Sequence, residues 1–93
     1  MDRKKIMYSI LKEIEKGEQE PKASDFEIED KKFYEICKIL KDGEYLNNVA
    51  LGAAYLVWLN SATLTEKGYD FLDENSPLSR TYKGLKEVRD WLK

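Results

Sequence analysis

The side chains best suited to chemistry in this 93-residue chain are lysines spaced along a predicted helix from Asp30 to Asp42. The apolar residues of this segment recur at i, i+3, i+4 and i+7, the spacing of a buried stripe; they are Phe33, Ile36, Cys37 and Leu40. The other positions therefore face outward. Lysines can neutralise phosphates, and a tyrosine can stack or donate to a phosphate. The candidate nucleic-acid-binding residues are Lys31, Lys32, Tyr34, Lys38 and Lys41.

The charge around these lysines favours a simpler interpretation. Asp30 to Asp42 carries four lysines against three acids, and the preceding Glu18 to Glu29 carries five acids against one lysine. The whole chain has 16 basic and 18 acidic residues, a net charge of −2. Phosphate binding depends on local positive charge, and dedicated nucleic-acid binders usually have a basic domain. A solvated helix face is therefore the simpler interpretation of these lysines.

The residue types that catalysis or metal binding requires are scarce. Cys37 falls on the inward stripe of the predicted helix, and the chain has no histidine to activate its thiol. One cysteine without histidine cannot supply the usual ligands of a zinc site. The sequence also has no paired-carboxylate motif and no glycine-rich phosphate loop. We therefore expect neither an enzyme nor a protein that binds a cofactor or a metal.

Three features of the sequence indicate where in the cell the protein is found. A lone cysteine forms no intrachain disulfide, which fits the reducing cytoplasm. The charged N-terminus lacks the apolar region of a signal peptide. The longest apolar run, Val49 to Leu59, is shorter than the roughly 20 residues of a membrane span. We expect a cytoplasmic protein without a membrane partner.

Helices are predicted on both sides of the candidate lysines. Apolar residues on one face predict a first helix from Arg3 to Lys16, and Gly17 offers a left-handed stop. A short helix should open at Ser24, because Ser24 and Glu27 match a capping box. The helix that carries the lysines follows and ends at Gly43.

An uncharged stretch from Leu46 to Thr65 predicts a β-hairpin. Its strands are expected at Tyr45 to Val49 and Tyr55 to Asn60, with the turn near Ala50 to Ala54 and Gly52 at positive φ. The turn has no basic residue. Its apolar tip can either fold back on the core or form a contact surface, and the sequence leaves both alternatives open.

Two further helices are predicted after the hairpin. Thr65 is the expected N-cap of the first, with Thr63 as a rival, and Asn75 can close it. Ser76 and Pro77 then start a long amphipathic helix from Pro77 to Trp91. The basic residues of the last helix, with Arg3, Lys4 and Lys5, could form a positive patch. Local i, i+4 pairs are the simpler expectation; they are Lys83–Glu87 and Lys86–Asp90.

This order of elements is that of a winged helix. The predicted fold class is α+β, mostly helical: a single winged-helix domain spanning residues 1–93, with an additional C-terminal helix. The predicted core includes twelve apolar residues; they are Ile6, Ile10, Ile14, Phe33, Ile36, Leu40, Leu56, Trp58, Leu64, Leu72, Leu85 and Val88. Replacing a buried Trp58 by alanine is expected to cost about 3–5 kcal/mol.

Several stretches carry a resemblance to known families. The segment Ala62 to Leu72, ATLTEKGYDFL, resembles the hairpin-to-helix junction of winged-helix regulators of the multiple-antibiotic-resistance and phenolic-acid repressor type. The opening KIMYSILKEI and the continuation DENS followed by YKGLKEVRDWL are similar to the YjcQ-like family of small bacterial and prophage proteins. The resemblance implies a winged helix of phage or prophage context. It carries over no catalytic or ligand-binding residue.

Two functions remain open from the sequence. The first, favoured by analogy because winged helices often bind DNA, is a DNA-binding, transcriptional-regulator-like module, with the candidate lysines and Tyr34 against double-stranded DNA. The second is a protein-interaction module, with a protein partner or a second copy of the chain bound at the uncharged hairpin and the last helix. One fold hosts many functions, so the predicted fold does not decide between them.

Overall fold

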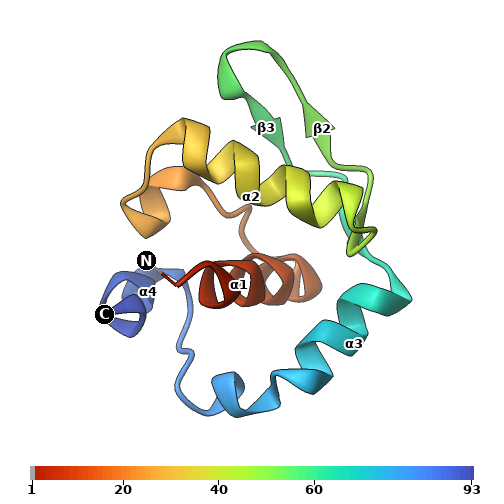
Figure 1. Cartoon of the computed structure of the whole chain (residues 1–93). Coiled ribbons are helices and arrows are strands. Elements are labelled where there is room, and N and C mark those ends of the chain that lie inside the picture. Colours follow the sequence, from red (N-terminus) through yellow and green to blue (C-terminus); the bar gives the residue numbers. More distant parts are fainter. Residues whose placement is uncertain (1) are drawn as a thin grey trace.

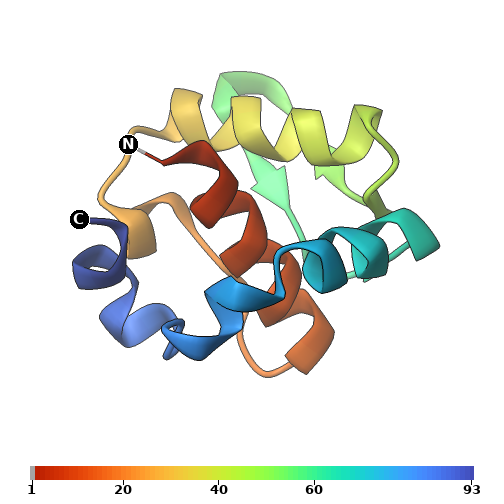
Figure 2. The ribbon, with the colours of Figure 1, turned by 60° about the horizontal axis from the view of Figure 1, so that its bottom comes forward.

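Helix α1 lies at the centre of the molecule, and the other elements surround it (Figures 1 and 2). A computed structural model describes residues 2–93. The helices are α1 (Arg3–Lys16), α2 (Asp30–Asp42), α3 (Glu66–Glu74) and α4 (Val88–Leu92). The strands are β1 (Leu46–Asn47), β2 (Ala50–Leu51), β3 (Val57–Trp58) and β4 (Thr63–Leu64). The result is a mostly helical α+β globule.

Helix α1 has the predicted bounds because both of its ends are capped by local contacts. The Asp2 carboxylate accepts a hydrogen bond from the Lys5 backbone N–H at 3.2 Å. At the other end Gly17 takes φ +69° and donates to the Glu13 carbonyl at 3.0 Å. Side chains at i, i+3 and i+4 spacing lie on one face. Ile6 and Ile10 are fully buried there, so this face of α1 forms one side of the core.

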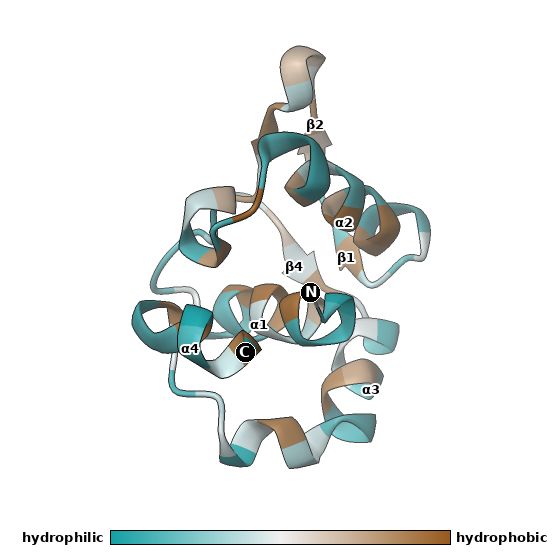
Figure 3. Ribbon diagram, turned by 60° about the vertical axis from the view of Figure 1, so that its left-hand side comes forward, coloured by the Kyte–Doolittle hydropathy of each residue, from teal (hydrophilic) through white to brown (hydrophobic). Residues whose placement is uncertain are grey.

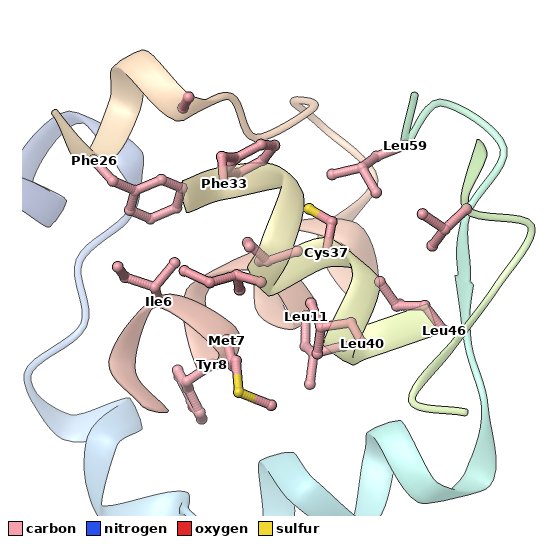
Figure 4. Close-up of a cluster of buried hydrophobic side chains, with 14 of the residues drawn as sticks. Ile6, Met7, Tyr8, Leu11, Phe26, Phe33, Cys37, Leu40, Leu46 and Leu59 are labelled. Carbon is pink, nitrogen blue, oxygen red and sulfur yellow. The ribbon is translucent and has the colours of Figure 1, made fainter. Parts of the chain in front are cut away.

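Helix α2 packs its predicted apolar stripe against this face of α1. Figure 4 shows Phe33 near Phe26, Leu40 beside Leu11 of α1, and Cys37 within the same buried cluster. The helix begins and ends where expected, with Gly43 as its C-cap. Burial of the stripe leaves the lysine-bearing positions outside, as the sequence predicts.

The predicted capping box at Ser24 and Glu27 is wrong. A 3₁₀ turn, Ala23–Phe26, forms instead of a short α-helix. The Asp25 carboxylate accepts from the Lys22 backbone N–H at 2.8 Å and so caps this turn. Glu27 takes φ +52°, which ends the turn at once.

The uncharged stretch folds into a hairpin, but its strands are much shorter than predicted. Two antiparallel ladders form; their Cα partners are Leu46↔Leu64 and Asn47↔Thr63 for β1 and β4, and Ala50↔Trp58 and Leu51↔Val57 for β2 and β3. Asn48 at φ +61° interrupts the first arm between β1 and β2. The tip is a 3₁₀ turn, Ala53–Tyr55, with positive φ at Ala54 and Tyr55. Gly52 has φ −131°, so its predicted positive φ is wrong.

The placement of Leu56 and Trp58 in the core is also wrong. Leu56 is 52% exposed and Trp58 46% exposed. Successive side chains of a strand point to opposite faces. Because Leu59 and Val49 are buried, Trp58 is turned outward. Of the remaining predicted core, Ile14 and Leu64 are partly buried and the others are buried.

Helix α3 is confirmed with both predicted caps. The Thr65 Oγ1 accepts from the Gly68 N–H at 3.0 Å, which identifies Thr65 rather than Thr63 as the N-cap. Asn75 is the C-cap. The helix packs on α1 and on β4, which holds the base of the hairpin against the core.

The predicted long helix from Pro77 to Trp91 is wrong. The chain forms a 3₁₀ turn, Ser76–Arg80, then an extended connection, a second 3₁₀ turn, Leu85–Glu87, and the short α4. Gly84 has φ +107°, a conformation that an α-helix cannot contain and that glycine adopts readily. The turn at Gly84 lets the chain fold around α1, which buries Leu85 and Val88.

The last segment is fastened to α1 and to the 3₁₀ turn before α2. The Tyr82 hydroxyl donates to the buried Glu13 carboxylate, and Lys5 Nζ donates to the Trp91 carbonyl at 3.0 Å. Neither predicted local pair, Lys83–Glu87 or Lys86–Asp90, forms within residues 2–93. The break at Gly84 removes the helical spacing of the first pair. Arg89 pairs with Glu27 instead, which ties α4 to a distant part of the chain.

Candidate functional site

The candidate lysines line the outer side of α2, as the sequence predicts. Lys31, Lys32, Lys38 and Lys41 are all exposed, whereas Tyr34 is half-buried. Positions i, i+4, i+7 and i+11 share one helix face. The stripe opposite the buried face therefore consists of residues of alternating charge; they are Lys31, Glu35, Lys38 and Asp42.

This outermost stripe is electrically balanced. Lys38 Nζ and Asp42 Oδ2 lie 2.6 Å apart, and this hydrogen bond raises the pKa of Lys38 above its ordinary value. Glu35 stands one turn from Lys31 and one turn from Lys38 on the same stripe. A phosphate approaching α2 would therefore meet carboxylates as well as ammonium groups, which weakens the attraction on which nucleic-acid binding depends.

Tyr34 supports the hairpin. Its ring centroid lies 5.5 Å from that of Tyr55, with the planes at 67°, an edge-to-face contact. Such aromatic pairs add to the stability gained from burial alone. The contact joins the outer face of α2 to the tip of the hairpin, so the two surfaces form one continuous region.

The hairpin presents large apolar side chains to solvent. Tyr55, Leu56 and Trp58 are 45%, 52% and 46% exposed. The β2–β3 arm rises from the molecule beside α2 (Figure 1). Figure 3 contrasts the mostly apolar hairpin with the hydrophilic outer turns of α2. We name Tyr55, Leu56 and Trp58 the hairpin surface.

Gly52 allows Trp58 to lie flat on the hairpin. A Cβ atom at Gly52 would stand 2.7 Å from Cζ3 of Trp58 and 3.6 Å from Cβ of Leu56. Glycine is therefore needed here for the close approach of the indole ring. The arrangement holds Leu56 and Trp58 side by side on one face of the hairpin, and both stay exposed.

A shallow groove of about 240 Å³ adjoins the hairpin surface. Its apolar walls come from the hairpin, from α2 and from the loop before α2; they are Pro21, Ala23, Phe33, Tyr55, Leu56 and Val57. Glu20, Lys22 and Asp30 complete its lining. The Glu20 carboxylate already has a partner, because it accepts a hydrogen bond from the Leu59 N–H at 3.0 Å. Lys22 and Asp30 are exposed and belong to no ion pair within residues 2–93.

A second, polar hollow of about 600 Å³ lies at the far end of α2. It contains Lys41 and Lys67 but also Glu44 and Glu66, so neither sign of charge prevails. Cys37 lies in the core, where burial raises the pKa of its thiol to about 12. A protonated, enclosed thiol is a poor nucleophile, in agreement with its predicted structural role.

The sequence left open a contact surface at the uncharged hairpin, but it placed Leu56 and Trp58 in the core and did not identify the groove. A signal was present: Leu56 and Trp58 stand at i and i+2 in a stretch without charge. That spacing indicates one face of a strand but not which face points to the core. The groove joins segments distant in sequence, so no local pattern could indicate it.

Comparison with known proteins agrees with the resemblance noted in the sequence. Residues 8–91 match the family described as YjcQ protein. The chain is 33% identical over 98 residues to a protein described as "Uncharacterized protein YjcQ" from Bacillus subtilis (strain 168), and the match covers 100% of both chains. No solved structure matches. Among residues 2–93, no helix has the length and apolar character needed to cross a bilayer. The chain belongs to the YjcQ family.

Proposed function

We propose that this chain is a small winged-helix module that binds a protein partner through its hairpin surface. The order helix, turn, helix, hairpin, helix supports the fold assignment. In a winged helix the hairpin stands beside the second helix of the helix-turn-helix pair, and here the β2–β3 arm stands beside α2 (Figure 1). The loop between α1 and the 3₁₀ turn Ala23–Phe26 is held against the hairpin, because the Glu20 carboxylate accepts a hydrogen bond from the Leu59 N–H.

The observation that carries the proposal is the exposure of Tyr55, Leu56 and Trp58 on one projecting, uncharged arm. Small monomeric proteins rarely leave adjoining large apolar side chains in water. Aromatic residues are enriched at the centres of protein interfaces, where charged residues are depleted. A rim of charged residues around the groove, Lys22 and Asp30, completes the usual pattern of apolar centre and polar edge.

DNA binding through α2 is the second candidate. The observation in its favour is that Lys31, Lys32 and Lys41 are exposed and belong to no ion pair in the described part of the chain. Against it stand the balanced outer stripe of α2 and a hairpin that has no basic residue to reach a phosphate. We rank it second for this reason.

Site-specific photo-crosslinking tests the protein-binding proposal. A photoreactive phenylalanine analogue would replace Leu56 in one variant and Glu74, exposed at the end of α3, in a matched control. We expect ultraviolet light to produce a discrete protein adduct at position 56 and none at position 74, in cells of the native host. An adduct at neither position, or equal adducts at both, would contradict the proposal.

An amide NMR titration with a mixed-sequence duplex tests DNA binding. The titration is run at roughly 50 mM salt and again at roughly 200 mM, because phosphate contacts weaken steeply over this range. We expect no shifts in α2 at either salt concentration. Shifts confined to α2 that fade at the higher salt, and that Lys31→Glu abolishes, would establish the second candidate.

A further inference from the structure

The groove beside the hairpin has opposite charges and an apolar centre. Lys22 comes from the loop after α1, whereas Asp30 comes from the first turn of α2. Between them lie the apolar walls, and Leu56 belongs both to these walls and to the hairpin surface. The molecule thus has an apolar projection directly beside an apolar hollow, with both signs of charge at its edge.

We infer that the partner bound by the hairpin surface is a second copy of this chain, an inference that rests on the proposed protein-binding function. In a two-fold symmetric dimer the same patch serves both subunits and must be complementary to itself. Like charges at such an axis would repel. The hairpin surface has no charge to repel its own copy.

The rim charges fit the same symmetry. When two copies meet by a two-fold rotation, residue i of one copy contacts residue j of the other, and residue j of the first contacts residue i of the second. Lys22 of each copy can then pair with Asp30 of the other, so two ion pairs form across the axis. Leu56 of each copy enters the groove of the other, where Phe33 and Val57 supply apolar walls.

The size of the contact sets its strength. A fully buried aromatic side chain covers about 150–250 Å², so the half-exposed hairpin surface offers on the order of 300 Å². A standard stable interface buries about 800 Å² per partner. The groove walls and rim add to the contact but leave it at the weak end. The dimer is therefore reversible and dissociates on dilution.

The volume of the groove also favours a side chain over a free ligand. Small-molecule pockets usually measure about 300–1,000 Å³ and enclose their ligand. This groove is smaller, about 240 Å³, and open to solvent. It suits an inserted leucine better than a metabolite.

Sedimentation velocity over a concentration series tests the inference. We expect the intact protein to shift from monomer to dimer as its concentration rises, and Leu56→Asp to remain monomeric because it would bury a carboxylate in the apolar groove of the other copy. Leu56 is exposed, so this variant should keep its fold, which circular dichroism checks. Lys83→Glu, on the far C-terminal segment, is the control and should dimerise normally.

A charge exchange makes the test specific to the proposed geometry. Lys22→Asp and Asp30→Lys should each weaken the dimer at least several-fold, since each sets like charges against each other. The double variant Lys22→Asp with Asp30→Lys should regain the affinity of the intact protein. A double variant no tighter than the single variants, or a Leu56→Asp protein that still dimerises, would overturn the inference.

The crosslinking experiment separates this inference from the proposed function. An adduct at position 56 with twice the mass of the chain supports both. An adduct of another mass, together with a protein that stays monomeric at millimolar concentration, overturns the homodimer and leaves the protein-binding proposal standing. Absence of any adduct together with a monomeric protein overturns both.

Discussion

The free-energy cost of replacing a tryptophan depends on whether its side chain faces the core or the solvent, and Trp58 faces the solvent. Because 46% of its surface stays in water, its removal forfeits only part of the apolar burial expected for a core tryptophan. We expect Trp58→Ala to lower the free energy of unfolding by about 1 kcal/mol, well below the cost of emptying a core site. Urea unfolding followed by circular dichroism measures it.

Phe33→Ala is the matched comparison, because Phe33 is 5% exposed and stacks on Phe26 with ring centroids 6.1 Å apart. Its loss should cost about 3–5 kcal/mol. Equal costs for the two variants would return Trp58 to the core and remove the basis of the hairpin surface.

Cys37 predicts a dependence of stability on alkaline pH. Burial raises the pKa of the folded-state thiol from 9.0 to about 12, so the unfolded chain loses this proton first. Stability from this group is complete below pH 9 and is lost as pH rises toward 12, at about 1.4 kcal/mol per pH unit.

Between pH 9 and pH 10, below the ordinary pKa of tyrosine, this loss belongs mainly to Cys37. We expect urea unfolding of the intact protein to show a falling free energy over this interval, whereas Cys37→Ala should be less stable but nearly flat. Parallel pH profiles for the two proteins would mean that the thiol ionises as readily in the folded protein as in the unfolded one.

At the scale of the element, α3 contains a glycine that packing requires. Glycine to alanine inside a helix normally stabilises it, by roughly 1 kcal/mol. At Gly68, however, a Cβ would stand 2.3 Å from the Tyr45 carbonyl oxygen. This backbone atom cannot swing away, because it also accepts from the Thr65 N–H at 3.2 Å.

We therefore expect Gly68→Ala to reverse the usual sign and to destabilise the protein by about 2 kcal/mol or more. Thermal unfolding followed by circular dichroism provides the measurement. Asp70→Ala, on the exposed side of the same helix, is the control and should change stability little. A stabilised Gly68→Ala protein would show that α3 can move away from β1 at small cost.

The elements that the sequence predicted well are those with local signals. The bounds of α1 and the caps of α3 follow from residues within one helical turn, such as Thr65 and Gly68. The strand register and the C-terminal path depend on distant contacts. Alternating apolar residues show which side chains share a face of a strand but not which face is buried. In this hairpin the buried face is the one that carries Leu59, which packs in the core.

Gly84 was the missed local signal. Four-and-three spacing of apolar residues continues across it, so periodicity alone predicts one helix. Glycine is costly in a helix interior and favourable at positive φ, and burial of Leu85 and Val88 on α1 stabilises the broken path. The lysines of α2 were correctly placed on the surface, but the Lys38–Asp42 pair and the Tyr34–Tyr55 contact depend on the assembled structure.

At the scale of the whole molecule, the proposed contact surface and the C-terminal segment lie on different sides of α1 (Figure 1). The hairpin and α2 occupy one side, and the segment from Ser76 onward covers the other. This segment closes the core with an aromatic cluster; ring centroids are 6.0 Å apart for Tyr8 and Tyr82 and 5.0 Å apart for Tyr82 and Trp91. The C-terminal segment thus closes the core on its side of α1 and leaves the hairpin surface on the other side exposed.

The cluster predicts that the protein cannot fold without its last residues. Ending the chain at Gly84 removes Leu85 and Val88, which are 7% and 0% exposed, and takes Trp91 away from Tyr8. It also removes the Lys5–Trp91 and Arg89–Glu27 contacts. Domains of this size have a stability of about 5–15 kcal/mol, and the loss of Leu85 and Val88 alone, at about 2–5 kcal/mol each, is comparable with it.

We expect the protein ending at Gly84 to show no cooperative unfolding and poor dispersion of amide NMR signals. The protein ending at Leu92 lacks only the exposed Lys93 and should match the intact chain. Cooperative unfolding of the shorter protein would mean that α1, α2, α3 and the hairpin hold together unaided. The hairpin surface would then stay in place without the C-terminal segment, whose role would be other than closing the core.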